Sequence, residues 1–130
     1  MLVLRLFNTQ KARLSQLPKA SNEIVKDFIS KLANAAGSRD KLSDCFTHDF
    51  QFFGCGYTVN KAPFVEKHLA TPNPEPLIPK CSSFNGNDSK ISFTASHQDG
   101  PRENIVDLVI SREEKDSPWR LQSGKITNCP

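Results

Sequence analysis

The side chains best suited to chemistry gather in residues 42–57, which read LSDCFTHDFQFFGCGY. This stretch holds His48 beside Asp49, the only tyrosine (Tyr57) and two of the four cysteines. An imidazole or a carboxylate can move a proton, and a tyrosine hydroxyl can donate a hydrogen bond to an oxyanion. The stretch is therefore the first place to look for a site.

Three residues are candidates for acid–base work, namely Asp49, Tyr57 and His97. His97 continues the apolar alternation of Ile91 and Phe93, so it would face the same way, although a histidine at a strand end usually faces solvent. An acid at position 49 more often caps a helix turn, and Tyr57 more often covers the edge of a core. We favour the structural role for each and keep all three as candidates.

Other chemistries find little support in the sequence. Metal binding needs three or four converging ligands, and the scattered histidines and cysteines fit no zinc spacing. Neither a phosphate-binding loop nor a Gly-x-Ser-x-Gly elbow occurs. We therefore expect no metal and no cofactor, and consider a non-enzyme more consistent with the sequence than an enzyme.

Composition indicates one globular domain. The chain has 130 residues, of which 37% are hydrophobic and 24% charged. The net charge of +3 comes from residues 1–22, which hold four basic residues and no acid, so the rest is close to neutral. We therefore expect no nucleic-acid partner. No apolar run approaches about 18 residues, so we expect no membrane span.

The chain divides into residues 1–20, a basic leader or flexible tail, and a domain over residues 21–130. The acid-free leader is similar to a mitochondrial transit peptide, and a mispredicted start that lost a signal peptide is the alternative. Four cysteines fit two disulfides in an oxidising compartment, or four reduced thiols. Secretion is favoured if they are oxidised, with a mitochondrial or cytoplasmic location as the alternative. The tripeptide Asn87-Asp88-Ser89 is a glycosylation sequon that matters only in a secreted chain.

Helices are predicted in the first half of the chain. Apolar residues at three- and four-residue spacing predict a helix over 23–36, capped by Asn22 and ended by a left-handed Gly37. Ser38 would cap a second, short helix, and Asn60 a third over 61–69. The prolines that follow should exclude both helix and sheet pairing; they stand at 72, 74, 76 and 79.

Strands are predicted after and between these helices. Residues 49–53 form the first, and 81–84, 90–98, 104–112 and 119–127 follow through short turns as an antiparallel meander. Gly124 would bulge the last strand. Asp107 interrupts an apolar strand and is expected on its outer, solvated face.

This order of elements resembles the nuclear transport factor two-like fold. The segment Phe46-x-x-Asp49-Phe50-x-Phe52, the glycine pair and the capped helix after it are similar to that family's helix–strand–helix segment, as is Trp119-x-Leu121. The resemblance covers residues 22–127. It implies an α+β fold in which three helices pack in a strongly curved, mainly antiparallel sheet shaped like a cone.

Such a cone encloses a cavity in many family members, which include ketosteroid isomerase-like and dehydratase-like enzymes, carriers and dimerisation modules. The resemblance implies that a ligand-binding cavity here would be lined by Phe28, Leu32, Phe50, Phe52, Phe93, Leu108 and Trp119. It also implies a Cys55–Cys129 disulfide, because the first and last strands of this fold are neighbours and each cysteine follows one of them. Cys45 and Cys81 would then be the second pair.

The sequence leaves three functions open. The favoured one is a non-catalytic domain that binds a small apolar ligand or a protein partner, forming a homodimer through the outer face of the sheet. The first alternative is a small isomerase or dehydratase using His97 or Asp49 with Tyr57. The second is a purely structural dimerisation module with a filled cone.

Overall fold

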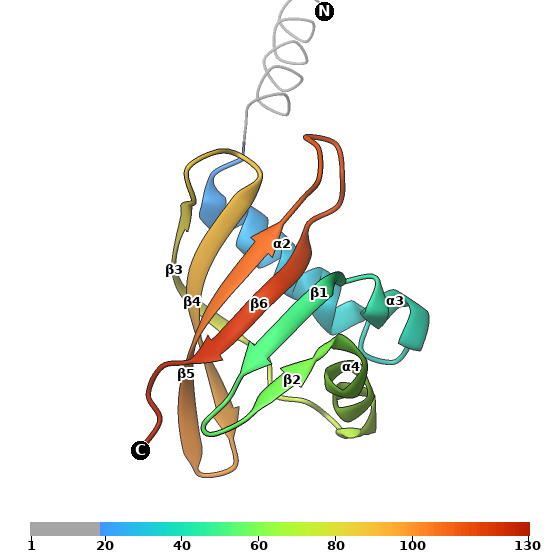
Figure 1. Ribbon diagram of the computed structural model, residues 1–130, viewed down its shortest axis with the longest axis vertical. Helices are drawn as coiled ribbons and strands as arrows, with labels where there is room; N and C mark the ends of the chain where they lie inside the picture. Colours follow the sequence, from blue (N-terminus) through green and yellow to red (C-terminus); the bar gives the residue numbers. More distant parts are fainter. Residues whose placement is uncertain (1–18) are drawn as a thin grey trace, which may run out of the picture.

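The computed structural model describes residues 19–130, which form one curved six-stranded sheet with helices on its inner face and at one edge (Figure 1). The helices are α2 (Ser21–Asn34), α3 (Arg39–Ser43) and α4 (Lys61–Ala70). The strands are β1 (Phe46–Phe53), β2 (Thr58–Asn60), β3 (Ile78–Phe84), β4 (Lys90–Asp99), β5 (Arg102–Ser111) and β6 (Arg120–Ile126). The leader predicted over residues 1–20 lies almost wholly outside the described residues and stays a prediction.

The strands lie in the order β2-β1-β6-β5-β4-β3. The predicted meander from β3 to β6 is confirmed, since each of these strands pairs antiparallel with the next. β1 and β6 run parallel, which brings the first and last long strands side by side in the middle of the sheet. Figure 1 shows α2 passing behind the sheet and α3 and α4 beside β1.

The core lies between α2 and the inner face of the sheet. Val25, Phe28 and Leu32 bury one stripe of α2. Alternate strand residues, such as Phe93 and Leu108, bury the facing surface because successive side chains point to opposite faces. Each such large side chain contributes roughly 1.5–3 kcal/mol by leaving water. Within residues 19–130, no helix is long and apolar enough to span a bilayer.

The helix ends differ in part from the sequence prediction. Ser38 does cap α3, accepting a hydrogen bond from the Lys41 backbone N–H at 3.4 Å. Asn60 precedes α4 as expected but makes no side-chain cap hydrogen bond. α2 begins at Ser21, before Asn22, and its right-handed C-cap is Ala35, so Gly37 is not the left-handed residue that ends it.

Two predicted strand features were wrong. Pro79 lies within β3, paired with Ala95, because β3 is an edge strand and a missing N–H is tolerated there. The bulge in β6 falls at Gln122, which the registers with β5 and β1 both skip. Gly124 is instead required for close packing, since a Cβ there would lie 2.8 Å from the Phe52 ring and 2.9 Å from Leu108.

Candidate functional site

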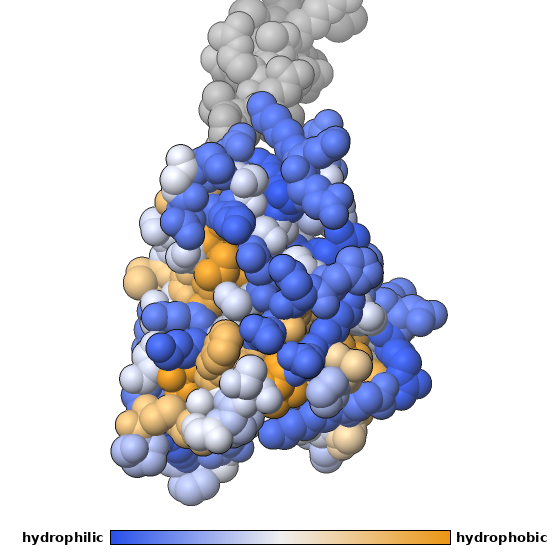
Figure 2. Space-filling model, in the orientation of Figure 1, coloured by the Kyte–Doolittle hydropathy of each residue, from blue (hydrophilic) through white to orange (hydrophobic). Residues whose placement is uncertain are grey.

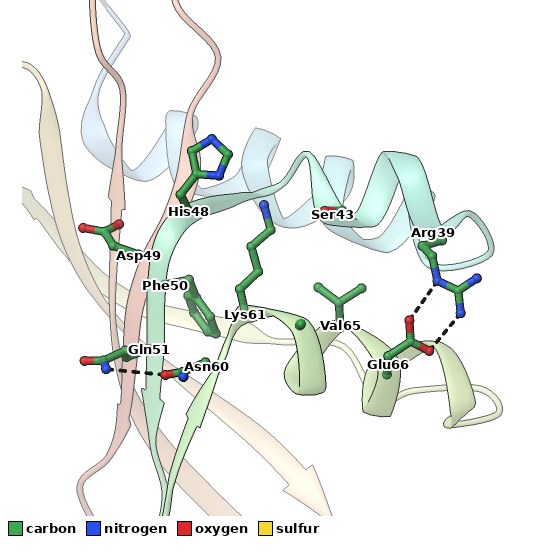
Figure 3. A pocket seen from close by; sticks show the side chains of 11 residues that line it. Arg39, Ser43, His48, Asp49, Phe50, Gln51, Asn60, Lys61, Val65 and Glu66 are labelled. Atoms are coloured by element: carbon green, nitrogen blue, oxygen red, sulfur yellow. Dashed lines mark hydrogen bonds and ion pairs between the residues drawn. The ribbon is translucent and has the colours of Figure 1, made fainter.

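Two hollows meet on the surface beside the first half of β1, and together we call them the β1 groove. The larger, of about 800 Å³, lies between β1, α3 and α4 (Figure 3). The other, of about 640 Å³, continues towards the start of β6. The residues common to both hollows are Ser43, His48, Asp49 and Lys61.

The groove exists because the first half of β1 leaves the sheet ladder. β2 pairs only with Gln51–Phe53, and the pairing of β1 with β6 skips from Phe46 to Gln51. On the β6 side of this gap stands Gln122, whose Oε1 is buried without a hydrogen-bond partner among the described residues. Residues 47–50 thus have no register partner in β2 or β6, and they form one wall of the groove.

Lys61 is the central side chain of the groove. It is the first residue of α4, directly after β2, and its Nζ donates a hydrogen bond to the Phe46 backbone carbonyl at 3.1 Å. Figure 3 shows its side chain crossing the groove towards Ser43 and His48. An ammonium group that covers an open strand edge in this way also protects the edge from pairing with another chain.

Ion pairs border the groove at both ends. Arg39 of α3 binds both carboxylate oxygens of Glu66 of α4 at 2.8 Å, and these hydrogen bonds lower the pKa of the exposed Glu66 carboxyl. At the other end Arg120 binds Asp44 at 3.0 Å. Basic and acidic residues are equally represented in the two linings, so the groove has no strong net charge.

Asp49 is the one predicted catalytic candidate that lines the groove. Its carboxylate is exposed and accepts a hydrogen bond from Thr47 Oγ1 at 2.7 Å, within its own strand and not from the preceding helix turn. Residues 19–130 hold no cluster of three or more metal-ligating side chains around it or elsewhere.

Tyr57 lies in the turn after β1, whereas Asp49 lies in the middle of that strand. A Cβ on Gly54 would lie 2.1 Å from the Tyr57 ring, so the ring packs directly over this glycine. The side chain is 47% exposed. The ring is not part of the hydrophobic core cluster, so the expected cover of the core edge stays a prediction.

His97 lies near the end of β4, half-buried and in register with the buried Asn104. The charge of His97 acts on His68, in the last turn of α4. Burial, and secondarily the proximity of His97, lowers the pKa of His68 below its ordinary value. The two imidazoles thus share one end of the cone.

The three catalytic candidates therefore occupy separate places: Asp49 in the groove, Tyr57 at the β1–β2 turn and His97 at the end of β4. No hydrogen bond joins any two of them within residues 19–130, and their catalytic roles stay predictions. Sequence reasoning missed Ser43 and Lys61 as site residues. No motif marks them, because they meet only through the packing of α3 and α4 against β1.

The predicted Cys55–Cys129 disulfide is confirmed. The second predicted pair is wrong, since Cys45 and Cys81 are both free. Cys45 is buried within the core and donates to the Lys41 carbonyl, whereas Cys81 is exposed on the outer side of β3 opposite Thr94. The sheet therefore separates them. Burial raises the pKa of the Cys45 thiol.

Comparison with known proteins agrees with this architecture. The family model for the NTF2-like domain matches residues 22–130. The chain belongs to the NTF2-like family. No curated protein matches it significantly.

Solved NTF2-like structures share the fold at low sequence identity. An NTF2-like protein from Cytophaga hutchinsonii is 16% identical with a TM-score of 0.58, covering 82% of this chain and 96% of its own. One of unknown function from Shewanella oneidensis is 8% identical with a TM-score of 0.60, covering 80% and 96%. A de novo designed protein with a curved β-sheet is 11% identical with a TM-score of 0.58, covering 82% and 99%. These likenesses show the fold alone.

The interior of this NTF2-like cone is packed with the chain's own side chains. The residues predicted to line a cavity belong to one hydrophobic cluster, in which Phe52 and Trp119 are partly buried and the other five fully buried. Phe64 of α4 stacks into the same space, with ring centroids 5.0 Å from Phe50 and 5.1 Å from Phe52. The two hollows of the β1 groove reach this cluster at Phe46, Phe50 and Val65, and a ligand cavity inside the cone stays a prediction.

Proposed function

We propose that this NTF2-like domain is a non-catalytic interaction module that forms a homodimer through the outer face of its sheet. The observation that carries the proposal is the composition of that face. The middle of that face carries few charged side chains, and charged residues are depleted at the centre of an interface.

The registers place three rows of side chains across the outer face. They are Ile78–Ser96–Ile105, Cys81–Thr94–Asp107–Lys125–Phe53 and Ser83–Ser92–Val109–Ser123–Gln51. In Figure 2 orange and pale surface gathers over the lower part of the sheet, and blue surface dominates towards the upper loops and α3. Ile78 is 57% exposed and Phe53 is 40% exposed, so both offer apolar area to a partner.

A second copy of the chain is the occupant that fits this face best. Asp107 and Lys125 are in register on neighbouring strands and are the charged residues of these three rows. A two-fold axis between them would place the Asp107 of each protomer opposite the Lys125 of the other, as isologous interfaces require. The serines beside Val109 leave room for another sheet to approach closely.

The filled cone and the separated candidates support the non-catalytic part of the proposal. Phe50 and Phe64 occupy space that a small apolar ligand would need. Proton transfer to a bound substrate needs converging acid and base groups, and Asp49, Tyr57 and His97 lie apart. A protein surface therefore suits this domain better than a reacting pocket.

Sedimentation equilibrium of the 14.5 kDa chain tests the proposal. Wild type is expected to have the mass of two chains, and Val109→Arg the mass of one, because the substitution buries an unpaired charge at the centre of the interface. Ala33→Arg, on the exposed side of α2, is the matched control and should stay dimeric. A monomeric wild type, or a Val109→Arg variant that remains dimeric, would refute the interface.

A further inference from the structure

The β3–β4 hairpin carries a feature that dimerisation does not use. Its tip holds Asn87-Asp88-Ser89, the one Asn-x-Ser/Thr tripeptide in the 130 residues. The hairpin stands at the top of Figure 1, away from the C-terminus. Such a tripeptide is the acceptor sequence for N-linked glycans when its middle residue is not proline, but short motifs also occur by chance.

Asn87 is exposed, and the carbonyl oxygen of its side chain is hydrogen-bonded to Ser89, the hydroxyl residue of the acceptor sequence. Its Oδ1 accepts hydrogen bonds from the Ser89 backbone N–H at 2.8 Å and from Ser89 Oγ at 2.5 Å. This is an Asx turn. The Asn87 Nδ2 donates to no described residue and is open to solvent. A donor on the carbonyl oxygen makes the amide N–H more acidic, which favours a nitrogen that must lose a proton.

Hydrogen bonds from Arg112, directly after β5, stabilise this turn. Arg112 donates from Nε and Nη2 to the Asp88 carbonyl at 3.1 and 2.9 Å, and its backbone N–H donates to the Ser89 carbonyl at 3.0 Å. The Arg112 guanidinium lies 4.6 Å from the centre of the Trp119 ring, a cation–π contact that fixes the side chain. These bonds use main-chain carbonyls of the tripeptide and leave the Asn87 amide nitrogen free.

A separate observation favours the compartment in which such a site would be used. Cys55 and Cys129 are both exposed and form a disulfide. Disulfides persist in oxidising environments, and these include the compartment where N-linked glycans are attached.

We propose that Asn87 is an N-glycosylation site. The reaction needs a lipid-diphosphate-linked oligosaccharide and the transferase that uses it. The Asn87 Nδ2 forms a bond to C1 of the first sugar, the bond from C1 to the phosphate oxygen breaks, the lipid diphosphate leaves, and a base of the transferase takes the proton from Nδ2. No oxidation or reduction occurs.

The test expresses the full chain behind a cleavable secretion signal in eukaryotic cells and measures the intact mass of the chains that have crossed the membrane. Wild type should gain the mass of one glycan, and a glycan-removing amidase should convert the Asn87 side chain to a carboxylate. Asn87→Gln and Ser89→Ala should lose the glycan, whereas Ser89→Thr should keep it.

Lys115→Asn in the Asn87→Gln background is the matched control. It places the same Asn-Asp-Ser tripeptide at residues 115–117, in the loop between β5 and β6, where the Ser117 backbone N–H already donates to the Glu114 carbonyl at 3.0 Å and is not free to close an Asx turn. Lower glycan occupancy there than at Asn87 would support the role of the turn. Translocated wild-type chains that carry the Cys55–Cys129 disulfide and the unmodified mass would overturn the proposal, whatever the control shows.

Discussion

Cys55 and Cys129 are joined by a disulfide across 74 positions of sequence. The two cysteines come close together because β1 and β6 are parallel neighbours, and the chain therefore leaves both strands at the same end of the sheet. It fastens the C-terminal residues to the β1–β2 turn. The bond therefore closes the fold at the end opposite the β3–β4 hairpin.

Removal of this disulfide should destabilise the domain strongly. A closed loop of this length lowers the entropy of the unfolded chain, and its loss typically costs about 2–5 kcal/mol. We expect the Cys55→Ser/Cys129→Ser double variant to unfold at a clearly lower urea concentration than wild type. An unchanged urea midpoint would show that the bond does not constrain the unfolded chain.

The two free thiols should react very differently. Cys81 is exposed, whereas Cys45 is buried and its pKa is raised, so Cys45 has little thiolate and little access to reagent. Alkylation of native, unreduced protein should modify one thiol quickly, and denaturation should reveal the second. In Cys81→Ser the fast reaction should disappear. Four thiols in the denatured, unreduced protein would contradict the disulfide.

His68 should make the domain less stable in mild acid. Its pKa is lowered by burial and then by His97, so between its folded pKa and its ordinary value of about 6.5 the unfolded chain binds more protons. The free energy of unfolding of wild type should therefore fall as pH drops through 6.5. Measured by urea unfolding, this fall should be smaller in His68→Gln.

The same pair of histidines can be followed by NMR titration. Because the charge of His97 contributes to the lowered pKa of His68, His97→Gln should move that pKa upwards, towards its ordinary value. A His68 pKa that does not change in His97→Gln would show that the two imidazoles do not interact.

Gly124 should tolerate no side chain. An added Cβ would meet the Phe52 ring and the Leu108 side chain at under 3.0 Å, and overpacking of this kind costs about 1–3 kcal/mol. Gly124→Ala should lower the midpoint of urea unfolding. Gly37→Ala is the control, since a Cβ there meets nothing within 4 Å and its φ is not positive. Equal midpoints for the two variants would argue against the close approach.

Much of this fold follows from local pattern. The apolar stripe of Val25, Phe28 and Leu32 predicts α2, and the alternation of apolar and polar residues predicts β4 and β5. Each of these elements buries one face, so apolar residues recur every three or four positions in the helix and at every second position in the strands. The outer position of Asp107 was also predictable, because the apolar residues on either side of it, Val106 and Leu108, point to the inner face. Asp107 is exposed and accepts a hydrogen bond from Thr94 at 3.0 Å.

The rest depends on contacts between distant parts of the chain. Pro79 is acceptable in β3 only because that strand lies at the edge, and the Gly124 packing depends on a Phe52 ring from another strand. The β1 groove arises where α3 and α4 meet an irregular half-strand. Ser43 and Lys61 lie 18 positions apart, and no periodicity connects them.

Charge reversal on the outer face tests where the dimer forms. In the proposed two-fold interface Asp107→Lys faces Lys125 of the partner subunit, and Lys125→Asp faces the partner's Asp107. Like charges brought together should weaken association by at least about tenfold, or roughly 1.4 kcal/mol. The double exchange restores opposite charges, so it should recover association.

The most direct measurement is the molar mass of these variants by sedimentation equilibrium at one concentration where wild type is dimeric. We expect each single reversal to lower the average mass from that of the dimer towards that of the monomer, and the double exchange to restore the dimer mass, with circular dichroism showing all of them folded. Equal masses for wild type, both single variants and the double exchange would contradict it, because Asp107 and Lys125 would then lie outside any interface.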